Sequence, residues 1–242
     1  VVSAPGKRFP EDTKTTDLLI ALADEYLRTG EATNKLEAVI GRYRSTALQL
    51  ELDEGIVQEI ADDFKQRLAS HPNDTARFID CLKAGGEDNN AKLIARYFQK
   101  RGIRAEYVNP KEAGLFVSDE AGNARVLQQS YDNLYRLRDR EGIVVFPGFF
   151  GYSPEGNLVT FPRGGSDITG AILAAALKAT LYENFTDVDS VYAVNPNIVD
   201  DPKEIHTLTY KEMRELSYAG FGVFHEEALA PAVRAGIPVC IK

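Results

Sequence analysis

The chain has 242 residues, of which 44% are hydrophobic and 26% charged, so it can bury a sizeable core without disulfides or a structural metal. Lys and Arg together number 28 against 36 for Asp and Glu, which gives a formal charge of −8. This acidic balance argues against a general nucleic-acid binder or a binder of anionic membranes, and no apolar run is long enough to span a membrane.

Helical periodicity dominates the first hundred residues, and Asp17 is the candidate cap of the first helix. The expected helices cover residues 18–28, two stretches within 33–70, a stretch from Pro72 toward residue 82, and 91–101. Between the last two, Gly85-Gly86-Glu87 is expected to break the helix in a turn, with Glu87 as an acid at the start of the next helix.

Beyond residue 102, short strands alternate with helices, which predicts an α/β fold with a mostly parallel sheet covered by helices on both faces. The apolar run 142–146 has the pattern of a strand buried on both faces. Further strands are expected at 103–108, 114–117, 180–184 and 238–241, and a small hairpin within 147–162. Helices are expected at 131–140, 168–177 (capped by Ser166 or Asp167), 210–218 (with a Thr209–Glu212 capping box) and 226–235.

The two cysteines, Cys81 and Cys240, lie far apart and have no CxxC partner. We predict two buried free thiols in a reducing compartment, and therefore a cytoplasmic protein. With three scattered histidines they are too few to build a metal framework. The chain shows no signal peptide and opens without Met on residues that look like the end of a strand, so we expect further sequence before Val1.

Four segments combine glycines and polar residues in the way that ligand-binding loops do. They are Gly85-Gly86-Glu87, Phe146-Pro147-Gly148-Phe149-Phe150-Gly151, Arg163-Gly164-Gly165-Ser166-Asp167 and Thr186-Asp187-Val188-Asp189-Ser190-Val191-Tyr192. The third precedes a helix, whose free N–H groups favour an anion, and its arginine suits a carboxylate or phosphate. Taken singly, each has an ordinary structural explanation as a turn or a helix start.

Together these segments resemble the catalytic domain of aspartate kinases, which have the amino-acid kinase fold, a three-layer α/β/α sandwich. The resemblance covers nearly the whole chain as a single domain, 1–242. It also rests on Ser3-Ala4-Pro5-Gly6-Lys7, Thr16-Asp17-Leu18-Leu19 and Met213-Arg214-Glu215-Leu216-Ser217-Tyr218-Ala219-Gly220. The last run is the most distinctive, because sister kinases of the fold lack it.

The resemblance implies transfer of the γ-phosphoryl group of MgATP to the β-carboxylate of L-aspartate, with Mg²⁺ held through the nucleotide and no metal site in the protein. The attacking carboxylate is already an anion, so the reaction needs positioning and cations rather than a general base. Arg163 would bind the α-carboxylate of aspartate and Glu87 its α-ammonium. Other residues implied to line this pocket are Thr16, Phe149 and Ser166.

On the nucleotide side, the resemblance places Asp167 where the family orients a catalytic lysine, and Lys242 near the nucleotide phosphates. Ser3 and Gly6 would lie in a loop that faces the transferred phosphoryl group. The residues implied to hold the adenosine end of ATP are Thr186, Asp187 and Tyr192. Residues 1–141 would form the lobe that binds the amino acid, and residues 142–242 the lobe that binds ATP.

Three departures from the family pattern stand out. The Lys-Phe-Gly-Gly run of the family's first strand is absent, Asn197 follows Asn-Pro where the family often has Arg, and the chain stops where the family continues into regulatory domains. We expect those domains to carry the main contacts of a homodimer or a higher oligomer. Two alternatives stay open: a kinase of the same fold with another acceptor, such as acetylglutamate, glutamate or a nucleoside monophosphate, and a catalytically silent fragment that binds a ligand or a partner.

Overall fold

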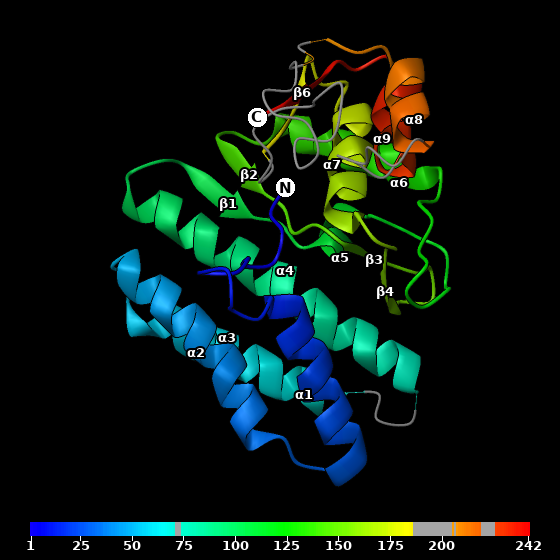
Figure 1. Cartoon of the computed structure of the whole chain (residues 1–242). Helices are drawn as coiled ribbons and strands as arrows, with labels where there is room; N and C mark the ends of the chain where they lie inside the picture. Colours follow the sequence, from blue (N-terminus) through cyan, green and yellow to red (C-terminus); the bar gives the residue numbers. More distant parts are fainter. Residues whose placement is uncertain (71–73, 186–204, 206, 219–225) are drawn as a thin grey trace, which may run out of the picture.

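The computed structural model describes residues 1–70, 74–185, 205, 207–218 and 226–242 (Figure 1). Several residues of interest fall outside these ranges: the three histidines, the whole adenosine-binding prediction and Asn197. None of the helices in the described ranges is both long and apolar enough to cross a membrane.

The first hundred residues form four helices that pack around one apolar core. They are α1 (Thr15–Thr29), α2 (Thr33–Gln49), α3 (Glu54–Leu68) and α4 (Thr75–Lys100). Amphipathic spacing aligns their apolar residues on one side, and the largest fully buried side chains there include Tyr43, Phe64 and Phe78. The two helices expected within residues 33–70 are therefore confirmed, and Figure 1 shows all four lying together in the lower part of the molecule.

The break expected at Gly85-Gly86-Glu87 is wrong, because α4 runs through it without interruption. A Cβ on Gly85 would lie 2.8 Å from the Phe64 ring, and one on Gly86 would lie 3.0 Å from the Cβ of Ala4. The glycines therefore permit close packing of α4, which offsets their cost of about 1 kcal/mol each in a helix interior. Glu87 lies in the middle of a helix and does not start one.

Two predicted caps are also wrong, since the helices begin earlier than expected. Asp17 lies inside the first turn of α1, which follows Lys14. Ser166 and Asp167 lie inside the first turn of α7 (Gly165–Ala176), which is preceded by Gly164 at φ +78°. In both cases these polar residues occupy the helix N-terminus, where an acidic side chain still interacts favourably with the helix dipole.

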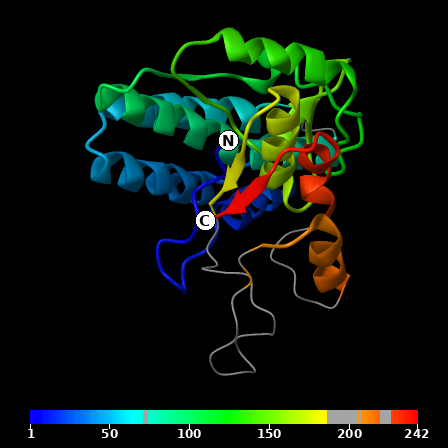
Figure 2. The same ribbon diagram turned by 90° about the horizontal axis from the view of Figure 1, so that it is seen from above.

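The strands are three residues each and pair in twos. β1 (Ala105–Tyr107) lies parallel to β2 (Ile143–Val145), and β5 (Tyr182–Asn184) lies parallel to β6 (Val239–Ile241), as Figure 2 shows for the second pair. β3 (Phe150–Tyr152) and β4 (Leu158–Thr160) form the expected hairpin. Val2 adds a parallel bridge to Pro147, just beyond β2.

Two strand predictions need correction. The expected strand at 114–117 makes only isolated bridges, from Phe116 to Tyr152 and from Val117 to Val126. β2 is not buried on both faces, because Ile143 is 42% exposed while Val145 is buried. The apolar run thus enters the interior only toward its carboxyl end, at Phe146.

A second apolar core contains side chains from α7 and from several shorter elements of the second half of the chain. α7 packs against α9 (Glu226–Arg234) and against α6 (Gln129–Tyr135), which continues as a 3₁₀ turn, η1 (Arg136–Asp139). The shorter elements are α5 (Pro110–Ala113) and α8 (Tyr210–Tyr218). The capping box of α8 is confirmed: the Thr209 N–H donates to Glu212 at 2.7 Å, and the Glu212 N–H donates to Thr209 Oγ1 at 3.3 Å. Both cysteines are free, as expected, but they are half-buried rather than buried.

Candidate active site

The N-terminal segment crosses the middle of α4. The Asn90 side chain donates to the carbonyl of Ser3 at 2.7 Å, and Ala4 packs against Gly86. Farther along, the carbonyl of Gly6 accepts a 2.7 Å hydrogen bond from Arg42 of α2. Ser3 and Gly6, both predicted to face the phosphoryl group, are thus held by helices of the N-terminal bundle.

Glu87 is the unusual group of this region, because it is a carboxylate buried in the middle of a helix. It is 6% exposed, and its Oε2 is one of two buried side-chain atoms in the described residues that lack a hydrogen-bond partner. Burial raises the pKa of Glu87 to about 8, against the opposing effects of the Ala4 backbone N–H and the Lys83 charge. An unpaired acceptor of this kind costs free energy unless a ligand donates to it.

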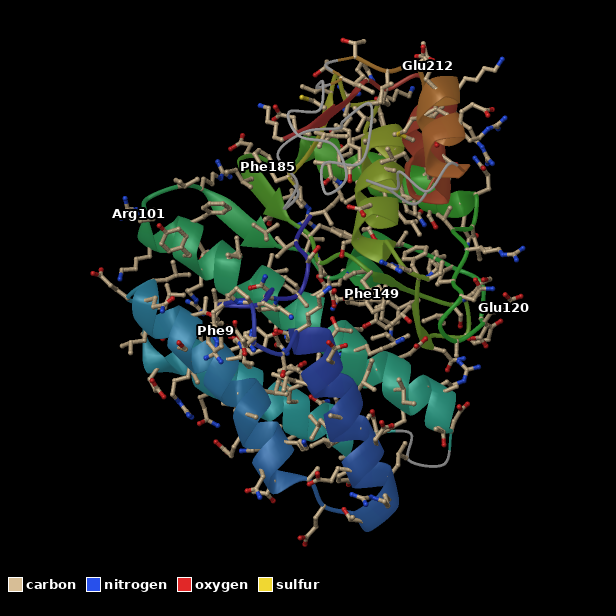
Figure 3. All side chains as sticks on the ribbon, in the orientation of Figure 1. Phe9, Arg101, Glu120, Phe149, Phe185 and Glu212 are labelled. Atoms are coloured by element: carbon tan, nitrogen blue, oxygen red, sulfur yellow. The ribbon has the colours of Figure 1, made fainter. Side chains whose placement is uncertain are left out.

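Phe149 lies in the centre of the molecule, between the helical bundle and the second core, as Figure 3 shows. Its backbone has φ +77°, which is uncommon for a residue other than glycine. Two hydrogen bonds hold this conformation: the Phe149 N–H donates to Thr169 Oγ1 at 3.0 Å, and its carbonyl accepts from Phe161 at 2.7 Å. The ammonium of Lys83, from α4, lies 5.4 Å from the ring centroid, so Phe149 links α4 to α7.

The N-terminus of α7 completes this side of the site. Gly148 packs so closely on Ser166 that a Cβ there would lie 2.6 Å from the Ser166 Oγ, and Gly165 lies against the ring of Phe149. Arg163, two residues before the helix, is exposed and makes no hydrogen bond or ion pair with the described residues. The N–H groups of the first turn and the Arg163 guanidinium are groups that suit an anion, although Asp167 lies in the same turn.

Asp167 and Lys242 are connected through Asn184, at the end of β5. The buried Asn184 side chain donates to Asp167 Oδ1 at 2.8 Å, while its carbonyl accepts from the Lys242 N–H at 2.8 Å. The Lys242 ammonium itself pairs with Glu183. The structure therefore brings these two predicted residues to one edge, but within the described part of the chain no lysine forms an ion pair with Asp167.

The sequence profile of the amino acid kinase family matches residues 6–242. The chain belongs to this family. It is 62% identical to aspartokinase 3 of Bacillus subtilis over 242 residues, which is 100% of this chain and 53% of that protein. The structure resembles the aspartate kinase of Clostridium acetobutylicum with a TM-score of 0.82 at 34% identity, covering 99% of this chain and 52% of that one.

A second solved relative is a ligand complex. Aspartokinase III of Escherichia coli, in complex with lysine and aspartate, matches with a TM-score of 0.76 at 30% identity, over 100% of this chain and 54% of that one. These neighbours confirm the predicted amino-acid kinase fold. The chain spans about half the length of the relatives it matches.

For several residues of this amino acid kinase site, sequence patterns give no sign that they belong to it. They occupy positions where polar residues of helices and strand ends are common, and no local spacing distinguishes them: Arg42, Lys83, Asn90 and Asn184. Their importance comes from contacts between distant segments. Thr16 lies half-buried in the first turn of α1. Its buried neighbour Thr15 donates a hydrogen bond from Oγ1 to the Pro5 carbonyl at 2.6 Å.

Arg42→Met is expected to loosen residues 6–13. The Arg42 side chain is 2% exposed and donates to the carbonyls of Gly6 and Thr13 and to Asp12. Its loss leaves these acceptors without their donor. Amide hydrogen exchange in this segment should accelerate roughly tenfold, with little change in α3. Arg44→Met, which removes an exposed arginine of the same helix, is the matched control; equal exchange in both variants would contradict the assignment.

Proposed function

We propose that this chain is the catalytic part of an aspartate kinase, which transfers the γ-phosphoryl group of ATP to the β-carboxylate of L-aspartate. The observation that carries the proposal is the buried Glu87 side chain, whose Oε2 has no hydrogen-bond partner among the described residues. The Lys83 charge acts on this carboxyl, and the same ammonium lies by the ring of Phe149, which packs on Gly165 at the N-terminus of α7. An amino acid supplies the complementary groups, one ammonium and two carboxylates. The chain's similarity to aspartokinases supports aspartate as this amino acid.

In this proposal, Glu87 accepts hydrogen bonds from the α-ammonium of aspartate, and Arg163 binds the α-carboxylate through its two-pronged guanidinium. Thr16, Phe149 and Ser166 line the same pocket. The ring of Phe149, fixed by its backbone bonds, limits the length of the acceptor side chain. The β-carboxylate is thereby left pointing toward the nucleotide.

The nucleotide is assigned to the opposite side of α7. Lys242 and the N–H groups of the α7 first turn would face its phosphates, Asp167 would orient a cation there, and Ser3 and Gly6 would border the transferred group. Thr186, Asp187 and Tyr192 would hold the adenosine. Mg²⁺ would enter bound to the nucleotide phosphates; among the described residues, no cluster of three His, Cys, Asp or Glu side chains could hold a metal ion.

The proposed chemistry needs positioning and no proton transfer. A β-carboxylate oxygen of aspartate attacks the γ-phosphorus, the bond from that phosphorus to the bridging oxygen of ADP breaks, and ADP leaves with the electron pair. The products are 4-phospho-L-aspartate and ADP. Fixed donors and cations stabilise the charge that spreads over the transferred group.

We extend the proposal to the organisation of the protein and its place in metabolism. Residues 1–141 would form the amino-acid lobe and residues 142–242 the nucleotide lobe of one domain. The reaction would open the route to lysine, threonine and methionine in the cytoplasm. A homodimer formed through regulatory domains would be the working assembly.

The test is acyl-phosphate formation, trapped with hydroxylamine, in the presence of MgATP and a panel of aspartate, glutamate and acetylglutamate. This chain and the complete product of its gene are assayed side by side. A hydroxamate that forms with aspartate, at least in the complete product, is the expected result. Formation with another acceptor only would overturn the choice of substrate, and no formation with any acceptor would favour a silent binding role.

A further inference from the structure

One face of α4 presents three polar side chains at helical spacing. Lys83, Glu87 and Asn90 are separated by four and three residues, so they lie on the same side of the helix. Asn90 holds the Ser3 carbonyl, and Lys83 lies by the ring of Phe149. Lys83 therefore belongs, with Glu87 and Asn90, to a polar stripe that faces the candidate site. The proposed function assigns no role to Lys83.

The ammonium of Lys83 is fixed in place. Its Nζ lies 3.3 Å from Asp80 Oδ1, and the Lys83 side chain is 18% exposed. Asp80 is itself immobile, because it accepts hydrogen bonds from the Gly122 N–H and from the N–H and hydroxyl of Thr160. Contact with Phe149 closes the other side of the ammonium. A positive charge is thus held one helical turn from Glu87.

The groups around Glu87 include few that can act on its carboxyl as the Lys83 charge does. On α4, Asp88 opposes ionisation of Glu87 and Lys83 favours it, and the Ala4 N–H of the N-terminal segment also favours it. From α2, the Tyr43 hydroxyl donates its hydrogen bond to the Gly86 carbonyl and not to Glu87. From α3, Arg67 and Asp63 pair with each other. Among the described side chains, Lys83 is the cation that most lowers the pKa of Glu87.

We propose that Lys83 is a positioning residue of the amino-acid subsite, whose fixed ammonium places a positive charge one helical turn from Glu87 and holds the ring of Phe149 in place. The identity of the ligand rests on the proposed function, but the effect of Lys83 on Glu87 does not. Asp80 retains Lys83 when a second ammonium reaches Glu87, so the two cations do not compete for one position.

The direct test follows the Glu87 side-chain carboxyl by ¹³C NMR through a pH titration of the ligand-free chain, with Glu87→Gln to assign the signal. Lys83→Met is expected to shift the titration midpoint upward by about one pH unit, and Lys83→Arg to restore it. Lys100→Met, which removes an exposed lysine of the same helix, should leave the midpoint unchanged. If Lys83→Met does not fold, Lys83→Gln, which can still donate to Asp80, takes its place.

The kinetic test separates this inference from the proposed function. In the active protein, Lys83→Met should raise the KM for aspartate roughly tenfold at pH 7 and less at pH 9, with kcat changed about twofold or less. An unchanged Glu87 midpoint in a folded Lys83 variant would overturn the inference. A shifted midpoint in a protein without aspartate-dependent turnover would support the role of Lys83 and remove the proposed function instead.

Discussion

Replacing Glu87 by Gln is expected to weaken aspartate binding about a hundredfold while making the folded chain more stable at pH 8. The binding loss follows because the neutral amide cannot offer a charge to the α-ammonium, and a charge-assisted hydrogen bond contributes roughly 1.5–3 kcal/mol. Calorimetric titration of aspartate into the two proteins measures this loss. Equal affinities would remove the assigned ammonium contact.

The gain in stability follows from the pKa of Glu87, which burial raises to about 8 from its ordinary value of 4.5. A group whose pKa is raised on folding contributes fully to stability below its unfolded pKa, and this contribution is lost as the pH rises through the folded pKa. Gln does not titrate, so the variant escapes this loss. Its advantage should grow from pH 4.5 to about pH 8, reaching on the order of 2–4 kcal/mol.

Urea unfolding at pH 5, 7 and 9 measures this difference in the free energy of unfolding. Glu59→Gln, at an exposed position of α3, is the matched control and should show no such trend. A constant difference between Glu87→Gln and wild type across this pH range would contradict the assigned burial cost. Opposite changes in stability and binding would mark Glu87 as a functional group retained at a cost to the fold.

Local patterns in the sequence predict the helices well and the site only in part. Helical spacing identified α2 and α3, and the Thr209–Glu212 box identified the start of α8, because each depends on residues within a few positions of one another. The same local reasoning predicted a helix break at Gly85-Gly86, which is wrong because α4 is continuous there. Glycine is needed there because Phe64 and Ala4, which come from other segments, leave no space for a Cβ.

The same distinction separates the site residues that were found from those that were missed. Motif resemblance singled out Glu87 and Phe149, but their burial and the strained backbone of Phe149 appear only in the folded chain. Lys83 reaches Phe149 across 66 positions of sequence, and Asn184 reaches Asp167 across 17. No periodicity or spacing encodes contacts of this kind, because they depend on how the two halves of the chain pack.

A second large effect is expected at the joint between α3 and α4, where Arg67→Met should destabilise the chain by about 3–5 kcal/mol. Arg67 is 10% exposed in its side chain and donates to Asp63 and to Asp88, each at 2.6 Å, and to the Cys81 carbonyl at 2.8 Å. Tyr107 of β1 donates to the same Asp88 carboxylate, so the network joins α3, α4 and the β1–β2 pair.

The pH dependence of this loss has a defined sign. Burial raises the pKa of Asp63, but the charge and hydrogen bond of Arg67, together with Lys92 and Asn89, outweigh it and hold that pKa below its ordinary value. Without Arg67, the cation left within ion-pair distance of both Asp63 and Asp88 among the described residues is Lys92, 3.5 Å from Asp63 and 3.8 Å from Asp88. Protonation of one carboxylate then becomes favourable, so the deficit in stability should be largest above pH 7 and should shrink toward pH 5.

Thermal and urea unfolding of Arg67→Met across this pH range measures the effect, with Arg96→Met, at an exposed position of α4, as the control. The double variant Arg67→Met with Asp63→Asn should recover part of the loss at pH 8, because one unpaired charge is removed. No recovery would mean that Arg67 acts through packing alone. Asp88 directly follows Glu87 in α4, so the charges around Asp88 lie next to the proposed aspartate subsite. Measuring aspartate binding to a double variant that has recovered its stability would therefore test whether binding needs these charges.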